Sequence, residues 1–181
     1  MTEWRDRLVE SIPPMSDRAT SRGFRLLVLG AALTAWALVA VGGVVRVTAS
    51  GLGCPHWPLC TARAIPLDRR ASIIEYSHRA VVALLTVLVV AVAVRAWRGY
   101  RSRREVLWPA LAAVVLVPLQ ALLGAVAVWL DLPGWVVAFH FVVGMLFLGT
   151  IVTTAVAAWR RPGQPDRKDG RHPTGSPCPC R

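Results

Sequence analysis

The chain has 181 residues, of which 55% are hydrophobic, and its mean hydropathy is +0.49. A soluble domain usually holds about 45–50% apolar residues, and the apolar residues of this chain are gathered in blocks. Its formal net charge of +11 is also seen in nucleic-acid-binding proteins. Here the basic residues lie between and beside the apolar blocks, so we expect a membrane protein and no nucleic-acid partner.

Four apolar runs are long enough to cross a bilayer, which takes roughly 20 apolar residues. In chain order they cover residues 26–47, 72–94, 107–130 and 135–159. They predict an all-α membrane protein in which a bundle of four transmembrane helices spans residues 26–160 and is surrounded by lipid. The first run is too long for the apolar part of a signal peptide, so we expect residues 1–25 to remain as an uncleaved extension.

The basic residues also predict the orientation of the helices. Many of them lie in residues 1–25, in the second connection near residues 95–104, and after residue 159. The first connection, residues 48–71, holds only Arg63, Arg69 and Arg70, and the third connection holds none. Because arginine and lysine favour the cytoplasmic side, we expect both termini in the cytoplasm and the first loop outside a bacterial or archaeal plasma membrane.

The last residues form a separate segment. Residues 161–181 are rich in proline, glycine and charge, and this composition predicts a disordered cytoplasmic tail. Cys178 and Cys180 lie in this tail, on the reducing side of the membrane. A metal-binding Cys-Pro-Cys motif is one interpretation, and free thiols in a flexible tail are the simpler one.

The first outer loop contains the stretch "SGLGCPHWPLC", with Cys54 and Cys60 on the oxidising side, where a disulfide can persist. Pro55 and Pro58 favour a turn that brings the two Cα atoms within the roughly 4.4–6.8 Å that a disulfide needs. Two unpaired thiols are the alternative. A zinc site is disfavoured because His56 is the only other ligand nearby.

Two histidines stand at matched positions in the second and fourth runs. Glu75, His78 and Arg79 lie on one helical face, and ionisable groups inside an apolar run mark a functional site by default. His140 is the only ionisable residue of its run. Both histidines lie about 8–9 Å below the outer boundary, which suits the two axial positions of a haem. The alternative is a pair of buried histidines that are hydrogen-bonded to the backbone.

Other polar and small residues occur at the same level. Arg46 and Arg79 are natural partners for haem propionates, although arginine near a helix end often simply reaches toward water. Gly42 and Gly43 allow a flat macrocycle or another helix to approach closely. Gln120, in the third run, can bond a ligand substituent or bridge two helices, and its position alone does not decide between these roles.

Taken together, four stretches resemble the haem A synthase family (the COX15/CtaA type). They are "GGVVRVTASGLGCPHWPLC", "EYSHR", "QALLG" and the histidine of "AFHF". The resemblance covers about residues 24–160. It implies a membrane oxidoreductase that converts the C8 methyl of haem O, its substrate, to the formyl group of haem A for cytochrome oxidase biogenesis. It also implies haem b as the iron-containing redox cofactor.

The resemblance assigns roles to residues as well. Glu75 matches the family's glutamate, His78 and His140 match two of its histidines, and Cys54 and Cys60 match a disulfide that assists electron or haem transfer. The usual member has eight transmembrane helices, and this chain resembles the N-terminal four. We therefore expect a homo-oligomer or a partner membrane subunit, acting with the oxidase assembly machinery.

Two non-enzymatic functions remain as alternatives. One is a b-type cytochrome with two histidine ligands, which passes electrons between membrane carriers. The other is a haem-handling assembly factor for the oxidase. A pure electron carrier has no need for Glu75 or for an outer cysteine pair, so these residues favour the enzyme or the assembly factor.

The predicted topology can be tested with reporter fusions at Arg161. We expect a reporter that works only in the cytoplasm to be active there, because arginine is concentrated on that side. Activity of a reporter that works only outside the membrane would overturn the topology and the depth argument for the histidines.

Overall fold

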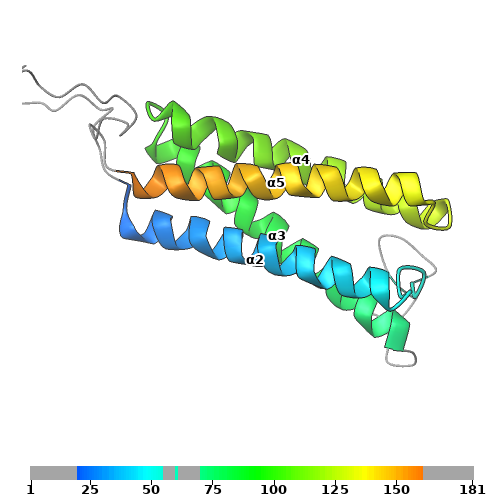
Figure 1. The fold of residues 1–181 in the computed structure, drawn as a ribbon. Helices are drawn as coiled ribbons and strands as arrows, with labels where there is room; N and C mark the ends of the chain where they lie inside the picture. The colour runs from blue at the N-terminus through cyan, green and yellow to red at the C-terminus, as the bar shows by residue number, and fades with distance from the viewer. Residues whose placement is uncertain (1–19, 55–59, 61–69, 161–181) are drawn as a thin grey trace, which may run out of the picture. The chain divides into compact units, whose positions relative to one another are not determined.

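The computed structural model describes residues 20–54, 60 and 70–160 and has four helices in this part of the chain (Figure 1). They are α2 (Arg22–Val47), α3 (Arg70–Gly99), α4 (Arg104–Trp129) and α5 (Gly134–Trp159). All four are long and apolar enough to cross a membrane, and the described residues contain no strand. The predicted all-α bundle of four membrane-spanning helices is confirmed.

Three helices extend beyond the predicted apolar runs at their basic ends. α2 begins at Arg22 instead of residue 26, α3 reaches Gly99 instead of residue 94, and α4 begins at Arg104 instead of residue 107. Arginine is a good helix former, and its long side chain carries the charge out of the apolar region. The helices therefore continue where the hydrophobic pattern stops.

Several predictions from the sequence concern residues outside the described part of the chain. These are the N-terminal extension up to residue 19, the tail of residues 161–181 with its two cysteines, and His56 in the outer loop. The predicted orientation and the domain limits stay predictions.

The helices pack as two hairpins. α2 packs against α3, α4 packs against α5, and the hairpins meet along α2 with α5 and α3 with α4. α3 and α5 therefore lie diagonally across the bundle, as do α2 and α4 (Figure 1). The α4–α5 turn is short, and Asp131 and Leu132 adopt positive φ angles of 58° and 59° in it.

The hydrophobic core fills only one end of the bundle, which we name the packed end. This end holds the start of α2 and α4 and the finish of α3 and α5. The core side chains are Phe24, Val28, Ala31 and Ala35 of α2, Leu85, Val89, Val92 and Ala96 of α3, Val106, Leu107, Ala110 and Ala113 of α4, and Phe147, Ile151, Ala157 and Ala158 of α5. Many are alanines, which let helices approach closely where lipid provides no hydrophobic driving force.

Polar contacts close the packed end. The buried Arg103 guanidinium donates to the Ala157 carbonyl at 2.9 Å and to Glu105 at 2.8 Å. Thr20 donates its hydroxyl to the Ala158 carbonyl, and the Arg25 guanidinium donates to the Thr20 carbonyl. These contacts tie the α3–α4 connection and the start of α2 to the end of α5.

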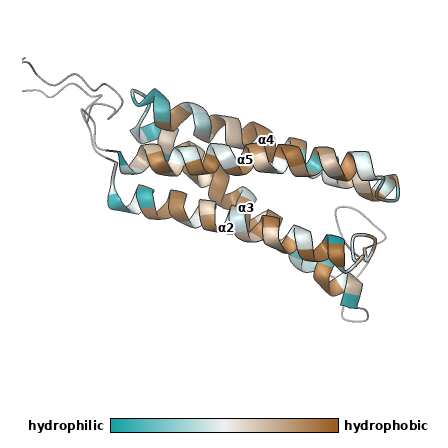
Figure 2. Cartoon of the chain, viewed as in Figure 1, coloured by the Kyte–Doolittle hydropathy of each residue, from teal (hydrophilic) through white to brown (hydrophobic). Residues whose placement is uncertain are grey.

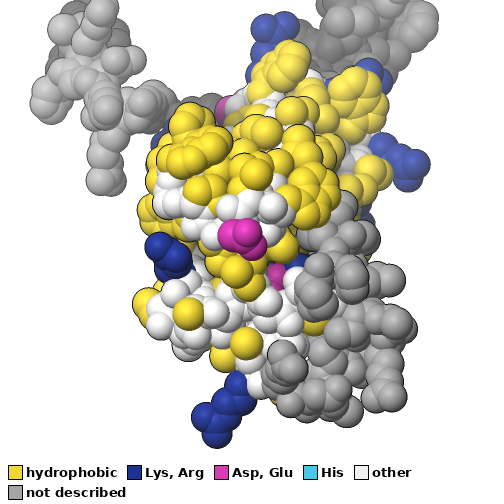
Figure 3. All heavy atoms as spheres, turned by 90° about the vertical axis from the view of Figure 1, so that its right-hand side faces the viewer, with side chains coloured by type: hydrophobic (Ala, Val, Ile, Leu, Met, Phe, Trp, Pro, Cys, Tyr) yellow, Lys and Arg dark blue, Asp and Glu magenta, His cyan; other side chains and the backbone are white. Residues whose placement is uncertain are grey.

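The opposite end, which we name the loop end, has a different composition. Its buried side chains are mainly small or polar, and include Ser50, Cys54, Ser72, Glu75 and Ala125. Within the described residues, the continuous hydrophobic core does not reach this end. Figure 3 views the bundle from this end and shows hydrophobic side chains over much of it.

The outer surface is typical of a protein in lipid. Hydrophilic residues lie mostly near the helix ends, with hydrophobic residues along the helices between them (Figure 2). Exposed tryptophans occur toward both ends of the bundle: Trp97, Trp108 and Trp159 near the packed end, and Trp129 and Trp135 near the loop end. Such belts mark the two membrane–water interfaces.

Candidate functional site

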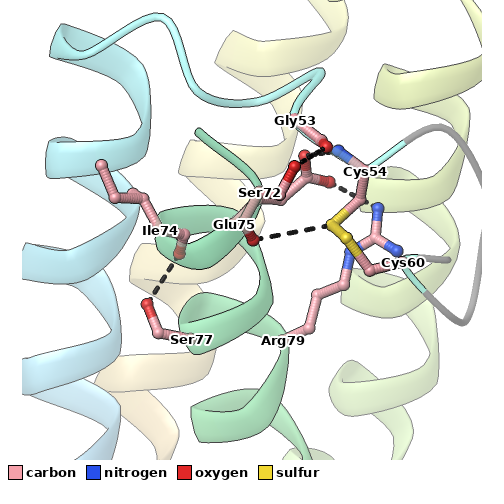
Figure 4. Close-up of a disulfide and its surroundings, with 8 residues drawn as sticks. All are labelled: Gly53, Cys54, Cys60, Ser72, Ile74, Glu75, Ser77 and Arg79. Carbon is pink, nitrogen blue, oxygen red and sulfur yellow. Dashed lines mark hydrogen bonds and ion pairs between the residues drawn. A yellow bond between two sulfur atoms is a disulfide. The ribbon is translucent and has the colours of Figure 1, made fainter. Parts of the chain in front are cut away.

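A disulfide joins Cys54 to Cys60 in the first outer loop, with a Cα–Cα distance of 4.4 Å (Figure 4). Both cysteines are buried. The sequence also allowed two unpaired thiols or a zinc ligand set, and the structure has the disulfide instead. The residues between Gly53 and the start of α3 are described only at these two cysteines.

The loop is held against the first turns of α3 by hydrogen bonds. The Cys54 backbone N–H donates to the Glu75 carboxylate, Oε2, at 2.8 Å, and the Ser72 hydroxyl donates to the Gly53 carbonyl at 2.6 Å (Figure 4). A Cβ atom at Gly53 would lie 2.4 Å from the carbonyl carbon of Ala71. Glycine is therefore required for the loop to come this close to the helix.

Glu75 lies at the centre of this junction and is 4% exposed. Its Oε1 accepts from the Arg79 guanidinium one turn away, while its Oε2 accepts from Cys54. A buried carboxylate is costly unless it is paired and hydrogen-bonded, and both conditions are met here. The predicted face of α3 thus brings Glu75 and Arg79 together. That Arg79 also binds a haem propionate stays a prediction.

The two histidines have matching surroundings on diagonal helices. A Cβ atom at Gly42 of α2 would lie 3.5 Å from Cε1 of His78, and one at Gly124 of α4 would lie 3.5 Å from Cε1 of His140. In each hairpin the first helix thus offers a bare stretch of backbone to the imidazole on the second.

Each imidazole has one buried ring nitrogen whose hydrogen bonding has to be accounted for. The Nδ1 atoms of His78 and His140 are buried and have no hydrogen-bond partner within residues 20–54, 60 and 70–160. These contacts neither confirm nor contradict the alternative of two histidines hydrogen-bonded to the backbone, and their role as haem ligands stays a prediction. Buried polar atoms without partners in a protein structure call for an explanation, such as an absent ligand.

Gln120 connects α4 to α5 beside this pair. Its side-chain amide donates to the His140 carbonyl at 3.0 Å, and its Oε1 is buried without a partner among the described residues. A Cβ atom at Gly144 would lie 3.0 Å from the Gln120 amide nitrogen. Gln120 thus bridges α4 and α5, which is one of the two roles considered for it. The other role, a contact with a ligand, stays a prediction.

Arg46 lies one turn beyond Gly42 on α2. It is exposed in the last turn of α2, and the described residues offer it no side-chain hydrogen bond or ion pair. The sequence analysis missed Gly53 and Ser72, which hold the loop, and Gly124, which faces His140. Glycine next to a cysteine in "GLGC" is the one available signal for Gly53. No local pattern indicates a role for Gly124, because that role depends on its facing His140 in the structure.

The donor set fits a haem better than a bare metal ion. The described residues contain no group of three or more His, Cys, Asp or Glu side chains that could hold a metal ion. A haem brings four nitrogen ligands of its own and needs at most two from the protein. The predicted pair is His78 and His140, which lie toward the end of the bundle that the hydrophobic core does not reach.

The Gly53 contact gives a direct test of the loop junction. Gly53→Ala should lower thermal stability by about 2 kcal/mol or more, because the new Cβ collides with α3 backbone and separates Cys54 from the Glu75 carboxylate. Gly43→Ala is the matched control, since no atom lies within 4 Å of a Cβ built there. Equal melting temperatures for the two variants would show that the loop does not depend on this approach.

Comparisons with known proteins agree with this architecture. The sequence profile of the COX15-CtaA family, described as "Cytochrome oxidase assembly protein", matches residues 25–176. A protein named "Heme A synthase" from Alkalihalophilus pseudofirmus is 36% identical over 138 residues, which are 75% of this chain and 44% of that protein. Proteins of the same name from Bacillus pumilus and Halalkalibacterium halodurans are 38% and 39% identical over 66% and 65% of this chain, and over 40% of their own length.

The chain thus spans about two fifths of the length of these curated relatives. The predicted resemblance is confirmed by the profile, which covers well over half of the sequence, and by the fold of four membrane-spanning helices. The chain belongs to the COX15-CtaA family of cytochrome oxidase assembly proteins.

Proposed function

We propose that the chain acts as a haem A synthase-like oxidoreductase, which converts the C8 methyl of haem O to the formyl group of haem A. The observation that carries this proposal is the pair of His78 and His140, each packed on a glycine and unpartnered at Nδ1, beside the buried Glu75. The names of the relatives support the same chemistry. The family to which the chain belongs also implies that haem is involved.

In this proposal the substrate haem lies between the hairpins, with His78 and His140 as axial ligands of its iron. Arg46, Arg79 and Gln120 are the residues we assign to its polar edges. Haem b, when bound, supplies one-electron redox chemistry. A second copy of this chain or a partner membrane subunit would hold it, because the described residues form one histidine pair.

Glu75 has the properties that oxidation of a methyl group needs. Turning a methyl group and one water into a formyl group releases four electrons and four protons, and positive charge develops at the carbon as electrons leave. A carboxylate in a site that excludes water stabilises such charge and can accept a proton from water. Each carboxylate oxygen has two acceptor positions, so one contact each with Arg79 and Cys54 leaves Glu75 able to accept more.

Arg79 and the disulfide loop serve as positioning elements in this scheme. They fix both oxygens of Glu75 and so hold its carboxylate one helical turn from His78, toward the loop end. The released electrons would need an acceptor, which a bound redox haem or an external carrier would supply. The reaction takes place near the outer face of a bacterial plasma membrane, in contact with the oxidase assembly machinery.

A haem-handling assembly factor is the second candidate function. The printed description of the family, "Cytochrome oxidase assembly protein", favours it. It would use the same histidine pair without the chemistry of Glu75. A b-type cytochrome is less well supported, because electron transfer alone gives no reason to bury a carboxylate against an outer disulfide.

The haem ligands can be tested by spectroscopy. The purified chain should show a low-spin, six-coordinate haem spectrum, and His78→Ala or His140→Ala should each abolish it, because a single imidazole leaves one axial position open. His172→Ala, in the predicted tail, is the matched control and should leave the spectrum unchanged. An unaltered spectrum in both site variants would show that other residues bind the iron.

The reaction can be tested by pigment extraction from a host that makes haem O but not haem A. Expression of the chain should yield haem A, and Glu75→Gln should lower the yield by about 100-fold or more while the haem spectrum persists. Glu105→Gln changes a glutamate at the packed end, where its partner is Arg103, and should have no effect. Haem binding without haem A, unchanged by Glu75→Gln, would favour the assembly factor.

A further inference from the structure

One polar side chain distinguishes the surroundings of the two histidines. Each imidazole turns the same edge to a glycine: the Cβ position of that glycine lies 3.5 Å from Cε1 and 3.9 Å from Nδ1 in both hairpins. Four residues before the glycine, α4 carries Gln120, whereas α2 carries Leu38 at the corresponding position. Leu38 packs against the hydrophobic core, while Gln120 bonds to the neighbouring histidine. The two hairpins thus differ in how they contact otherwise similar imidazoles.

The contact of Gln120 is made with the backbone of His140. Its side-chain N–H donates to the His140 carbonyl at 3.0 Å. A carbonyl oxygen has two acceptor positions, so this bond can add to the hydrogen bond within the helix instead of replacing it. Gln120 lies one turn from Gly124 on the same face of α4. These two residues of α4 therefore contact one residue of α5, at its carbonyl and at its ring.

Gly144 provides the room for this contact. It lies one turn after His140 on α5, and a Cβ atom there would be 3.0 Å from the Gln120 amide nitrogen, closer than an ordinary van der Waals contact. At the corresponding position after His78, α3 has Val82. The second hairpin thus combines a glutamine with a glycine, where the first has two branched apolar residues. This pairing is expected if the two positions serve one contact.

Two hydrogen-bonding atoms at this contact have no partner within residues 20–54, 60 and 70–160. They are Oε1 of Gln120 and Nδ1 of His140, and both are buried. The His140 carbonyl fixes the orientation of the amide, because only the N–H side can donate to it, so Oε1 remains as an acceptor. Unbonded polar atoms are costly inside a membrane, and an Nδ1–H group that donates to Oε1 satisfies both atoms together.

The imidazole is well placed for this bond. Its Nδ1 lies on the edge of the ring that faces α4, the helix that carries Gln120. The torsion about the Cβ–Cγ bond of histidine has a broad energy minimum, so the ring can turn Nδ1 toward Oε1 at little cost.

We propose that Gln120 is the residue that positions His140 for the haem iron. Its N–H holds the His140 carbonyl, and its Oε1 accepts a hydrogen bond from Nδ1–H of the ring. A neutral imidazole carries its proton on one nitrogen only, so this bond leaves Nε2 without a proton and able to bind iron. The proposal rests on the function proposed above, in which His140 is an axial ligand. The second amide N–H stays available for the polar edge of the haem.

The two axial histidines are then not equivalent. A hydrogen bond donated by Nδ1–H makes an imidazole a more basic ligand, which favours ferric over ferrous iron. His140 gains this support from Gln120, whereas α2 presents Leu38 at the corresponding place beside His78. His140 is therefore the ligand whose ring orientation and basicity the protein sets from outside the ligand pair.

The first test uses the haem-free chain and does not involve activity. At about pH 8 an imidazole is neutral, and ¹⁵N NMR shows which ring nitrogen carries the proton. With the signals assigned from His78→Ala and His140→Ala, wild-type His140 should carry its proton on Nδ1. Gln120→Met keeps a side chain of similar length without the amide and should abolish this preference. His78 is the internal control and should keep its tautomer in both chains.

The wild-type measurement does not depend on the folding of any variant. A proton on Nε2 of His140 in the wild-type chain, or a tautomer that Gln120→Met leaves unchanged, would overturn the proposal.

The second test is the midpoint potential of the haem-loaded chain. Gln120→Met should raise it, because a less basic ligand stabilises ferric iron less. Gly144→Ala displaces the Gln120 amide and should raise the potential by a smaller amount. Gly149→Ala is the matched control on the same helix, since no atom lies within 4 Å of a Cβ built there, and should leave the potential unchanged. Equal potentials for Gln120→Met and the wild-type chain would show that the amide does not act on the ligand.

The outcomes separate this proposal from the proposed function. A tautomer of His140 that depends on Gln120 supports the positioning role even if the chain makes no haem A. Loss of the haem spectrum in His140→Ala, together with a tautomer that Gln120→Met does not alter, overturns the positioning role and leaves the haem function intact. An unchanged haem spectrum in His140→Ala overturns the assignment of His140 as a ligand, and the positioning role with it.

Discussion

The arrangement of the loop end depends on the burial of one carboxylate. Glu75 is 4% exposed, and a charge in that position is tolerable only because Arg79 and the Cys54 backbone N–H engage its two oxygens. The same contacts hold the disulfide loop on α3, and Gly53 makes the approach possible by having no side chain. Through these shared contacts the loop, the disulfide and the start of α3 form one structural unit.

The two ends of the bundle differ in the side chains that connect the helices. At the packed end, alanines and valines of all four helices interlock, and Arg103 ties the α3–α4 connection to α5. At the loop end the helices instead present histidines, glycines and a glutamine to one another. The hydrophobic packing that joins the four helices is thus concentrated at the packed end, away from the histidine pair.

The sequence predicted most of the fold because lipid imposes a simple requirement on it. Long apolar runs bounded by arginine can hardly form anything except spanning helices, and errors were confined to basic helix ends such as Arg104. The site was predicted in part, through the matched depths of His78 and His140 and the shared face of Glu75 and Arg79. These relations depend on helical geometry alone.

The contacts that the sequence did not reveal are those between distant segments. The bond from Cys54 to Glu75 depends on the path of the loop, and no local pattern encodes it. Gly124 faces His140 only because of the way in which α4 and α5 are rotated about their axes relative to each other.

The glycines that face the two imidazoles determine how this site can change over evolution. Because backbone, not a neighbouring side chain, limits the room for each ring, the surrounding apolar residues can be exchanged for others of similar size without moving the rings. A Cβ atom at Gly42 or Gly124 would lie in ordinary van der Waals contact with an imidazole, at 3.5 Å from Cε1, so a side chain larger than that of alanine would push on the ring. A lineage can therefore replace much of its lipid-facing surface and keep the geometry of the pair, as long as these two positions carry nothing larger than alanine.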